Sequence, residues 1–185
     1  MGPGRKAWRI LSTGTSRPGV FEESLLPHVD ALYGLAMRLT RDADAAADLL
    51  QDTVVRALER FHQLRKPNAA RAWFVRILTT TFLNRYAGRI WVNPPATEAE
   101  PVFEETPEGA LLRRRDAEEV EAALAELRDD FRLTLLLADV EELPLREIAA
   151  ICRCPVGTVA SRLARGRQAL RARLRHLRVA RTEDA

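Results

Sequence analysis

Hydroxyl and guanidinium side chains gather in the segment that follows Pro155. At helical spacing, one stripe of this segment carries Thr158, Ser161, Arg162 and Arg165. An arginine can fork onto a guanine edge or clamp a phosphate, and a serine or threonine hydroxyl can reach either group. These residue types at this spacing indicate contact with DNA.

The elements that would position this stripe are a short helix, a tight turn and a longer helix. Pro144 stands in the first turn of the short helix, and the turn is Cys152-Arg153-Cys154-Pro155. The longer helix begins near Val156. Apolar side chains mark its inner stripe: Val159, Leu163, Leu170 and Leu174. The pattern over Pro144–Leu174 is typical of a helix-turn-helix.

An amphipathic helical hairpin with solvated arginines is the alternative interpretation of this segment. Between Glu147 and Glu183 the sequence has nine arginines and no acidic residue. A solvated helix usually mixes charges of both signs. The whole chain has a net charge of +3 and a pI of about 9.3, which suits a polyanionic partner. Charge therefore favours DNA contact over the hairpin.

Composition indicates a soluble, all-α protein. Of its 185 residues, 46% are hydrophobic and 30% charged, and no run shows the alternation of a strand. No stretch reaches the length of a spanning helix, so we expect no membrane insertion. Residues 1–19 are basic and rich in Gly, Ser, Thr and Pro, without the apolar core of a secretory signal. We predict a disordered basic arm there and a cytoplasmic location.

Helical periodicity is interrupted in the middle of the chain. Prolines and five glutamates over Glu98–Glu108 predict an extended acidic linker between two small helical domains. In the second domain, a further helix over Phe131–Val140 precedes the helix-turn-helix. The predicted boundaries are 1–19 for the arm, 20–88 for the first domain, 89–112 for the linker, 113–178 for the second domain and 179–185 for a tail.

The first domain contains three predicted helices. Apolar spacing predicts the first over Phe21–Leu39. Asp42 or Asp44 can cap the second, and Asn68 can cap the third, Ala69–Tyr86. The connection between the second and third helices is a predicted loop.

Two polar faces of the first domain have two interpretations each. Asp48 and Asp52 lie one turn apart, and this like-charged pair suits either a solvated face or a docking surface for a basic partner. In the third helix, aromatic residues alternate with arginines, and an aromatic stripe is more often core than a base-stacking platform. Its polar side makes a second nucleic-acid face an equal alternative, through Arg76, Thr79, Thr80 and Asn84.

Cys152 and Cys154 are the two cysteines of the chain. Residues two apart are badly placed for a disulfide framework, and two thiols alone do not make a zinc site. Structural thiols in the turn are the favoured interpretation, with a redox or metal role as the alternative. No Gly-rich phosphate loop, Ser/His/Asp set, metal-ligand cluster or apposed acid pair emerges. We therefore expect that the protein is not an enzyme and that it has no catalytic residue and binds no metal or cofactor.

Two helical domains, an acidic linker and a terminal helix-turn-helix resemble the extracytoplasmic-function (ECF) group, group 4, of bacterial RNA polymerase sigma factors of the sigma-70 family. That group keeps only domains 2 and 4. Asp48–Thr53 resembles the segment that docks on the polymerase clamp helices, and Arg71–Ile77 resembles the start of the −10 reading helix. Three further segments resemble domain 4: Leu137–Glu141, Glu147–Ala149 and Gly157–Leu163.

The resemblance implies a protein that binds the clamp helices and flap of core RNA polymerase and directs transcription initiation at promoter DNA. The implied polymerase-binding residues are Asp48, Leu49, Gln51, Asp52 and Thr53. Those implied for the −10 element are Lys66, Asn68, Arg71, Trp73, Arg76, Thr79, Thr80 and Asn84. Those implied for the −35 element are Thr158, Ser161, Arg162, Arg165 and Arg167. The acidic linker would thread the RNA exit path.

The run Arg76–Asn84 most resembles the actinobacterial branch of the group, which zinc-containing, thiol-sensing anti-sigma proteins hold. The resemblance therefore implies a cognate anti-sigma partner. The alternative function is a helix-turn-helix regulator that binds DNA without polymerase. Such a regulator needs neither the Asp48–Thr53 face nor the Trp73 helix, so these two features discriminate between the functions.

Overall fold

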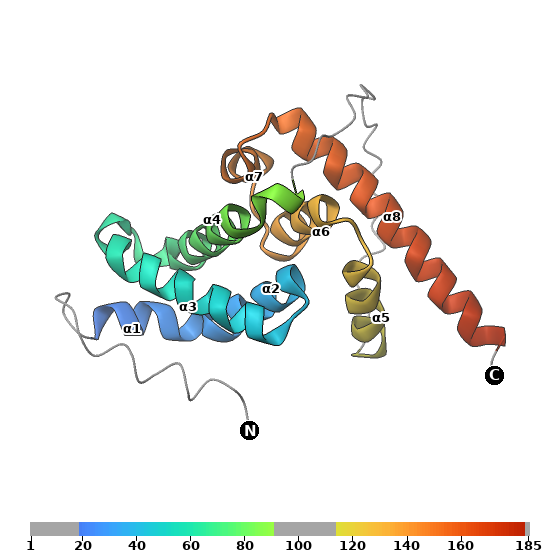
Figure 1. Cartoon of the computed structure of the whole chain (residues 1–185), viewed down its shortest axis with the longest axis horizontal. Helices are drawn as coiled ribbons and strands as arrows, with labels where there is room; N and C mark the ends of the chain where they lie inside the picture. Colours follow the sequence, from blue (N-terminus) through green and yellow to red (C-terminus); the bar gives the residue numbers. More distant parts are fainter. Residues whose placement is uncertain (1–18, 91–113, 184–185) are drawn as a thin grey trace. The chain divides into compact units, whose positions relative to one another are not determined.

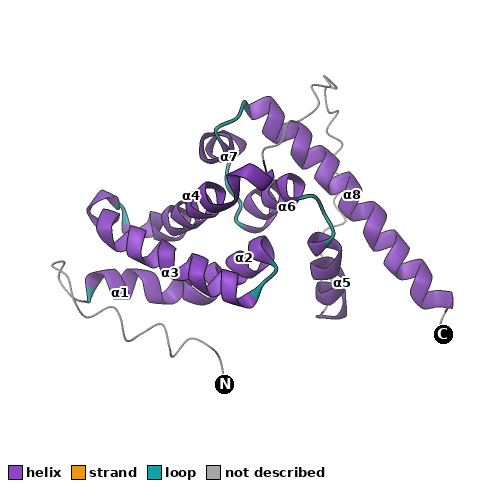
Figure 2. Ribbon diagram, in the orientation of Figure 1, coloured by secondary structure: helices purple, strands orange, loops and turns teal. Residues whose placement is uncertain are grey.

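The computed structural model describes residues 19–90 and 114–183, with side chains over 19–85 and 118–175. Every regular element within these ranges is a helix or a helical turn, and they contain no strand (Figure 2). The prediction of an all-α chain is confirmed. The basic arm up to residue 18, the linker from residue 91 and the last two residues of the tail lie outside the described residues.

The chain divides into two compact units, Met1–Phe82 and Leu83–Ala185. The first unit contains α1, α2, α3 and most of α4, and the second contains α5 to α8 (Figure 1). Two helical domains were predicted and are present. The division falls within α4, a few residues before the predicted boundary at residue 88.

The first predicted helix consists of two α-helices joined by a short turn. α1 (Val20–Leu25) leads through the 3-10 turn η3 (Leu26–His28) into α2 (Val29–Thr40). Pro27 lies in that turn and has no N–H to donate, which explains the interruption. α2 ends where Arg41 takes a left-handed conformation with φ 59°.

α3 (Ala43–Arg60) begins at a side-chain cap. The Asp42 carboxylate accepts a hydrogen bond from the N–H of Ala45 at 2.7 Å. Of the two predicted caps, Asp42 is therefore the one that the structure uses. α3 packs along α2, and these two helices form the principal helix pair of this unit.

The predicted loop before the third helix contains two 3-10 turns, η4 (Phe61–Gln63) and η5 (Pro67–Ala69). α4 then spans Ala70–Ile90. Asn68 lies inside η5 and not next to the first residue of α4, so the cap predicted for Asn68 is wrong.

The core of the first unit is apolar and almost fully buried, and it includes Phe21, Leu32, Leu35, Leu49, Phe74 and Leu78.

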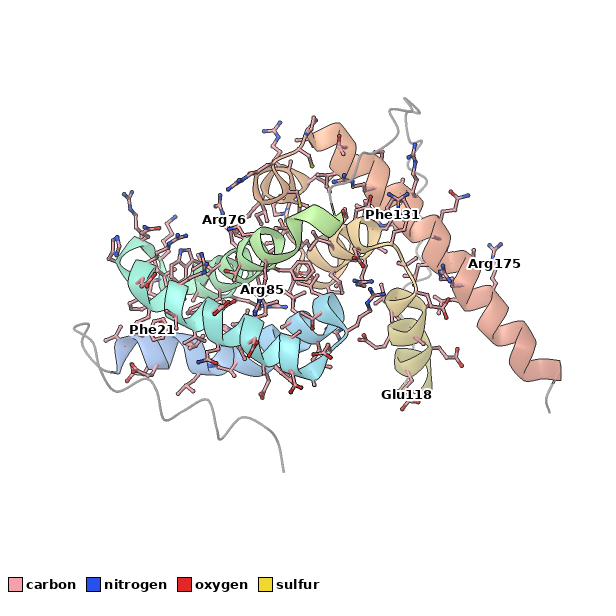
Figure 3. The ribbon with its side chains drawn as sticks, viewed as in Figure 1. Phe21, Arg76, Arg85, Glu118, Phe131 and Arg175 are labelled. Atoms are coloured by element: carbon pink, nitrogen blue, oxygen red, sulfur yellow. The ribbon has the colours of Figure 1, made fainter. Side chains whose placement is uncertain are left out.

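In the second unit, α5 (Arg114–Ala125), α6 (Asp129–Leu135) and α7 (Leu145–Cys152) all pack on the long α8 (Val156–Glu183). A π-helical turn, η6 (Leu136–Val140), follows α6. The predicted helix Phe131–Val140 is thus a short α-helix that widens into a π-turn. Figure 3 shows Phe131 beside the middle of α8, with Glu118 on α5 and Arg175 on the C-terminal half of α8.

Candidate DNA-binding and docking surfaces

The turn between α7 and α8 has the tight geometry that the sequence predicts. α7 ends at Cys152. The capping residue Arg153 has a left-handed φ of 51°, and its N–H donates to the carbonyl of Ala149. The N–H of Cys154 bonds the same carbonyl at 3.1 Å, and Pro155 cannot continue the helix. The Pro155 carbonyl then accepts hydrogen bonds from the N–H groups of Thr158 and Val159 in the first turn of α8. α7, this turn and the first half of α8 therefore form a helix-turn-helix.

The inner side of α8 is set by small and apolar residues. Val159 and Leu163 are buried, and Gly166 approaches α6 closely. A Cβ on Gly166 would lie 3.1 Å from Cδ1 of Leu135 and 3.3 Å from Cβ of Phe131. The first half of α8 therefore has one fixed inner side, and its outer side is left for a partner.

The outer side carries hydroxyls and one flanking arginine. Thr158, Ser161 and Arg165 are all partly exposed. The Ser161 hydroxyl donates to the carbonyl of Thr158 at 3.0 Å and keeps its oxygen as an acceptor for an outside donor. Val156, the first residue of α8, is 42% exposed and was not predicted as a contact. An apolar side chain there suits the methyl group of a thymine.

Arg162, predicted to share this outer stripe, does not lie on it. Its side chain is 7% exposed, and Nε lies 3.5 Å from Oδ2 of the equally buried Asp130 on α6. Its Nη1 also lies 3.9 Å from Sγ of Cys154. The prediction that Arg162 faces DNA is therefore wrong. The buried carboxylate of Asp130 attracts the guanidinium to the inner side of α8. Loss of one partner of such a buried pair typically costs about 3–5 kcal/mol of stability.

Arg167 has a partner within the chain. Its Nη2 lies 2.7 Å from Oδ1 of Asp139, in the π-turn, and its Nε lies 3.2 Å from Oδ2. Both side chains are about two-fifths exposed. At about 100° of helix rotation per residue, Arg165 and Arg167 lie on opposite flanks of the outer side of α8. The structure thus separates the two arginines that were predicted together.

Burial governs the two thiols of the turn. Burial raises the pKa of Cys152 from 9.0 to about 12, with a smaller rise from Cys154 and an opposing effect of Arg162. Burial also raises the pKa of Cys154, again against Arg162. Both cysteines are free thiols. A raised pKa keeps a thiol protonated, which disfavours the redox-switch alternative.

In the first unit, α4 presents a polar stripe at four-residue spacing. Arg76 and Asn84 are exposed, and Thr80 between them is partly exposed; Figure 3 shows Arg76 on α4. The Thr80 hydroxyl donates to the carbonyl of Arg76 at 2.7 Å. Thr79, predicted for the same side, is fully buried, and its hydroxyl donates to the carbonyl of Val75. Its predicted place on a DNA-contacting surface is therefore wrong.

An aromatic cluster supports the loop before α4. Trp73 is partly exposed, and its ring packs edge-on against Phe74 at 5.2 Å and Phe61 at 6.4 Å between centroids. Phe21 meets Phe61 at 5.2 Å, which ties the cluster to α1. The polar residues predicted for the −10 element in this part of the chain are exposed: Lys66, Asn68 and Arg71. Trp73 thus has a structural role and still offers part of its surface to the outside.

α3 presents an acidic face. Asp48, Gln51 and Asp52 are exposed, whereas Leu49 and Thr53 are fully buried. The Thr53 hydroxyl donates to the carbonyl of Leu49, so these two residues belong to the core and not to the predicted contact surface. The sequence analysis missed Val55, which is 46% exposed and lies one turn beyond Asp52. Its spacing of seven from Asp48 is a signal that the sequence carries.

The buried pair Asp130–Arg162 was missed because polar residues were assigned to the outside of their helices. At about 100° of rotation per residue, Arg162 lies about 40° from Thr158 and about 60° from Val159, on the border of the two sides of α8, so the helical period alone does not assign its side. Among the described residues, no group of three or more His, Cys, Asp or Glu side chains is placed to hold a metal ion. None of the described helices is both long and apolar enough to cross a membrane.

The fold and these surfaces define a two-domain helical protein with a C-terminal helix-turn-helix, and comparisons with known proteins give its family. The sequence model of sigma-70 region 2 matches residues 26–92, and that of sigma-70 region 4 matches residues 117–170. The chain belongs to the ECF group of the sigma-70 family of RNA polymerase sigma factors, as the similarity to its members also shows.

Two relatives are about one-third identical to this chain over the aligned residues. This chain is 36% identical over 155 residues to "ECF RNA polymerase sigma factor SigE" of Mycolicibacterium smegmatis. The alignment covers 82% of this chain but only 60% of that relative's length. The chain is 32% identical to the "RNA polymerase sigma-H factor" of Pseudomonas aeruginosa, covering 81% of this chain and 83% of the relative.

A solved structure shares the fold. It is the sigma factor RpoE in complex with the anti-sigma factor NepR from Bartonella quintana, with a TM-score of 0.61 and 27% identity. The match covers 84% of this chain and 96% of that one.

Proposed function

We propose that this chain binds core RNA polymerase and directs it to promoters, with the first unit at the −10 element and the second at the −35 element. The observation that carries the proposal is the order of three surfaces. An acidic face on α3, a polar stripe on α4 with an aromatic-backed loop, and a helix-turn-helix follow one another along the chain. A regulator that binds DNA alone needs only the third.

In the second unit, α8 would enter the major groove with its N-terminal half. The contacts that we propose are Thr158, Ser161 and Arg165, with Val156 against a thymine methyl. Arg165 on the flank suits a phosphate or a guanine edge. The residue Arg162 is left out of this set because its guanidinium is buried.

In the first unit, the α4 stripe and the loop before it would contact the −10 element. Lys66, Asn68 and Arg71 supply charge and hydrogen bonds around the partly exposed Trp73. An unpaired base that leaves the duplex must be captured to offset an unstacking cost of a few kcal/mol. A loop that is backed by rigid aromatic rings suits such capture, because little ordering remains to be done when the base arrives.

The acidic face would dock on a basic surface of the polymerase. Asp48, Gln51 and Asp52 surround the exposed Val55 on one side of α3. An apolar centre with a charged rim is the usual anatomy of a protein–protein contact. An anti-sigma protein is a further proposed partner, supported by the complex in which the similar RpoE was solved. Control by a zinc-containing anti-sigma protein, as in the actinobacterial branch, rests on the run Arg76–Asn84 alone.

Reconstitution with core RNA polymerase tests the proposed function. We expect the full chain to co-elute with the polymerase in size-exclusion chromatography and to give transcripts that start at a few sites of a genomic template. The polymerase alone should give none of these transcripts. Binding of the chain to duplex DNA without any association with the polymerase would establish the alternative, a regulator that acts without polymerase.

A further inference from the structure

The buried arginine of α8 connects three parts of the helix-turn-helix. Arg162 stands one turn after Thr158 and lies between the neighbouring residues Ser161 and Leu163. Its guanidinium reaches Asp130 at the start of α6 and Cys154 in the turn before α8. The helix that carries the proposed DNA contacts is therefore held from within by a residue that does not face DNA.

Contacts with residues other than Arg162 hold the carboxylate of Asp130 in place. Arg128 donates from Nε and Nη2 to the two carboxylate oxygens at 3.2 and 3.1 Å, and the N–H of Phe131 donates to Oδ1 at 3.1 Å. The hydroxyl of Thr134 donates to the backbone carbonyl of Asp130 at 2.7 Å. The carboxylate thus presents a defined edge to the arginine.

The other contacts on the inner side of α8 are made by apolar or small residues. Val159 and Leu163 are buried, Gly166 meets Leu135 and Phe131 of α6, and contacts between apolar or small groups have little directional preference. Arg162 adds a charged contact to this side: its planar guanidinium lies against the fixed carboxylate as an ion pair, with Nε 3.5 Å from Oδ2 and no hydrogen bond from Nε. A rotation of α8 by about 20° would move an atom at the helix surface by about 2 Å, which is enough to break a hydrogen bond to a base.

We propose that Arg162 is a positioning residue, which with Asp130 sets the rotation of α8 and thereby which side chains meet the bases of the −35 element. The inference rests on the proposed function, because it assigns the specificity of that site. Thr158, Ser161 and Arg165 make the contacts, and Arg162 fixes the face on which they stand. Loss of the pair therefore changes discrimination between DNA sequences more than it changes stability, provided that the space is refilled.

The test refills the space with apolar side chains. In the double variant Arg162→Met/Asp130→Leu, no charge of the pair is left buried, and such replacements of buried ion pairs often preserve stability. The variant and the wild type are each assembled with core RNA polymerase. A duplex that the wild-type holoenzyme selects from a random library, and a scrambled duplex of equal composition, serve as probes.

We expect the midpoint of thermal unfolding of the double variant to stay close to that of the wild type. The ratio of its Kd values for scrambled and selected duplex should fall by about tenfold, the loss expected when one base contact is misplaced. The conservative variant Arg162→Lys keeps a cation near Asp130 but lacks the planar guanidinium, so its ratio should lie between those of the wild type and the double variant. Arg165→Met is the matched control, which removes a proposed DNA contact, keeps the pair of Arg162 and Asp130, and should weaken binding.

A double variant that is stable and discriminates as well as the wild type would overturn the positioning role and leave the proposed function intact. Failure of the wild-type holoenzyme to select any sequence would overturn the proposed function and the inference with it. If the double variant is too unstable to assay, Arg162→Lys decides alone, because a lysine variant with wild-type stability and an unchanged or abolished ratio contradicts the role.

Discussion

Burial determines the pKa of the two thiols in the turn of the helix-turn-helix. Cys152 and Cys154 flank the left-handed Arg153, and both thiols have a raised pKa because they are removed from water. Arg162 opposes the rise for both, since a nearby cation favours the thiolate. The net result is a turn with two protonated thiols at neutral pH.

The raised pKa of Cys152 predicts a loss of stability at alkaline pH. Well below pH 9.0 the thiol is protonated in both the folded and the unfolded chain, and stability does not depend on its ionisation. As the pH rises from 9.0 towards 12, the unfolded chain releases the proton and the folded chain keeps it, so folding becomes less favourable. Cys152→Ala should show a smaller alkaline loss of stability in urea unfolding than the wild type. Parallel curves for the two proteins would contradict the assigned pKa.

At the scale of elements, the crossing of α8 over α6 depends on the absence of a side chain at Gly166. Leu135 and Phe131 fill the space that a Cβ would occupy. The terminal atoms of Leu135 can rotate away, but the Cβ of Phe131 is fixed to the backbone of α6. An alanine at this position therefore requires its neighbours on α6 to shift by a few tenths of an ångström.

Alanine at two glycines should have opposite effects. Gly34→Ala, within α2, meets its nearest side-chain atom at 3.9 Å and should stabilise the chain by about 0.5–1 kcal/mol, the helix preference of alanine over glycine. Gly166→Ala gains the same preference but must displace α6, and overpacking of this kind costs about 1–3 kcal/mol. We expect a higher unfolding midpoint for the first variant and a lower one for the second, followed by circular dichroism. A stabilised Gly166→Ala variant would show that α6 and α8 can separate at little cost.

The ion pair between the π-turn and α8 should restrain Arg167. An exposed pair contributes about 0–1 kcal/mol to stability, so its loss is easily tolerated. Asp139→Asn should leave stability almost unchanged and release Arg167 for a phosphate, which strengthens DNA binding at low salt. Adding Arg167→Ala to that variant should cancel the gain. Electrophoretic mobility shifts of the holoenzyme at several salt concentrations provide the measurement, and an equal affinity for Asp139→Asn and wild type would exclude the restraint.

The ends of the helices could be predicted from the sequence because their signals are local. Asp42 caps α3, and Pro144 and Pro155 precede α7 and α8, as their chemistry dictates. The rotational phase of polar residues could not be predicted in the same way. Thr79 satisfies its hydroxyl on the backbone and Arg162 finds Asp130, so both are buried although both are polar. Those partners lie in tertiary packing or in the backbone of the same helix, which composition does not reveal.

At the scale of the whole molecule, charge is distributed unevenly between the units. In the first unit, an acidic face lies on α3. In the second unit, the N-terminal half of α8 carries arginines and no acidic residue. A protein partner with a basic surface suits the first, and a polyanion suits the second. One chain thus carries the means to join a protein and a nucleic acid.

Charge reversal on α3 should separate these two roles. Asp52→Lys changes an exposed side chain of the acidic face and should weaken assembly with core polymerase, with the largest effect at low salt. Helix content and DNA selection by any holoenzyme that forms should not change. Glu118→Lys, on the exposed side of α5, makes the same change of net charge in the other unit and is the control. Equal polymerase affinity for wild type and Asp52→Lys, measured by fluorescence anisotropy of the labelled chain, would remove α3 from the docking surface.

The aromatic cluster also makes the protein its own optical probe. The chain has three tryptophans, and Trp73 is the one within the described residues. Its indole touches Phe61 at the start of the loop and Phe74 in α4, and part of it meets solvent. With Trp8 and Trp91 replaced by Phe, all tryptophan emission comes from this ring. A captured base stacked near the loop would quench that emission and shift its wavelength, so the opening of promoter DNA could be followed in real time without any attached dye.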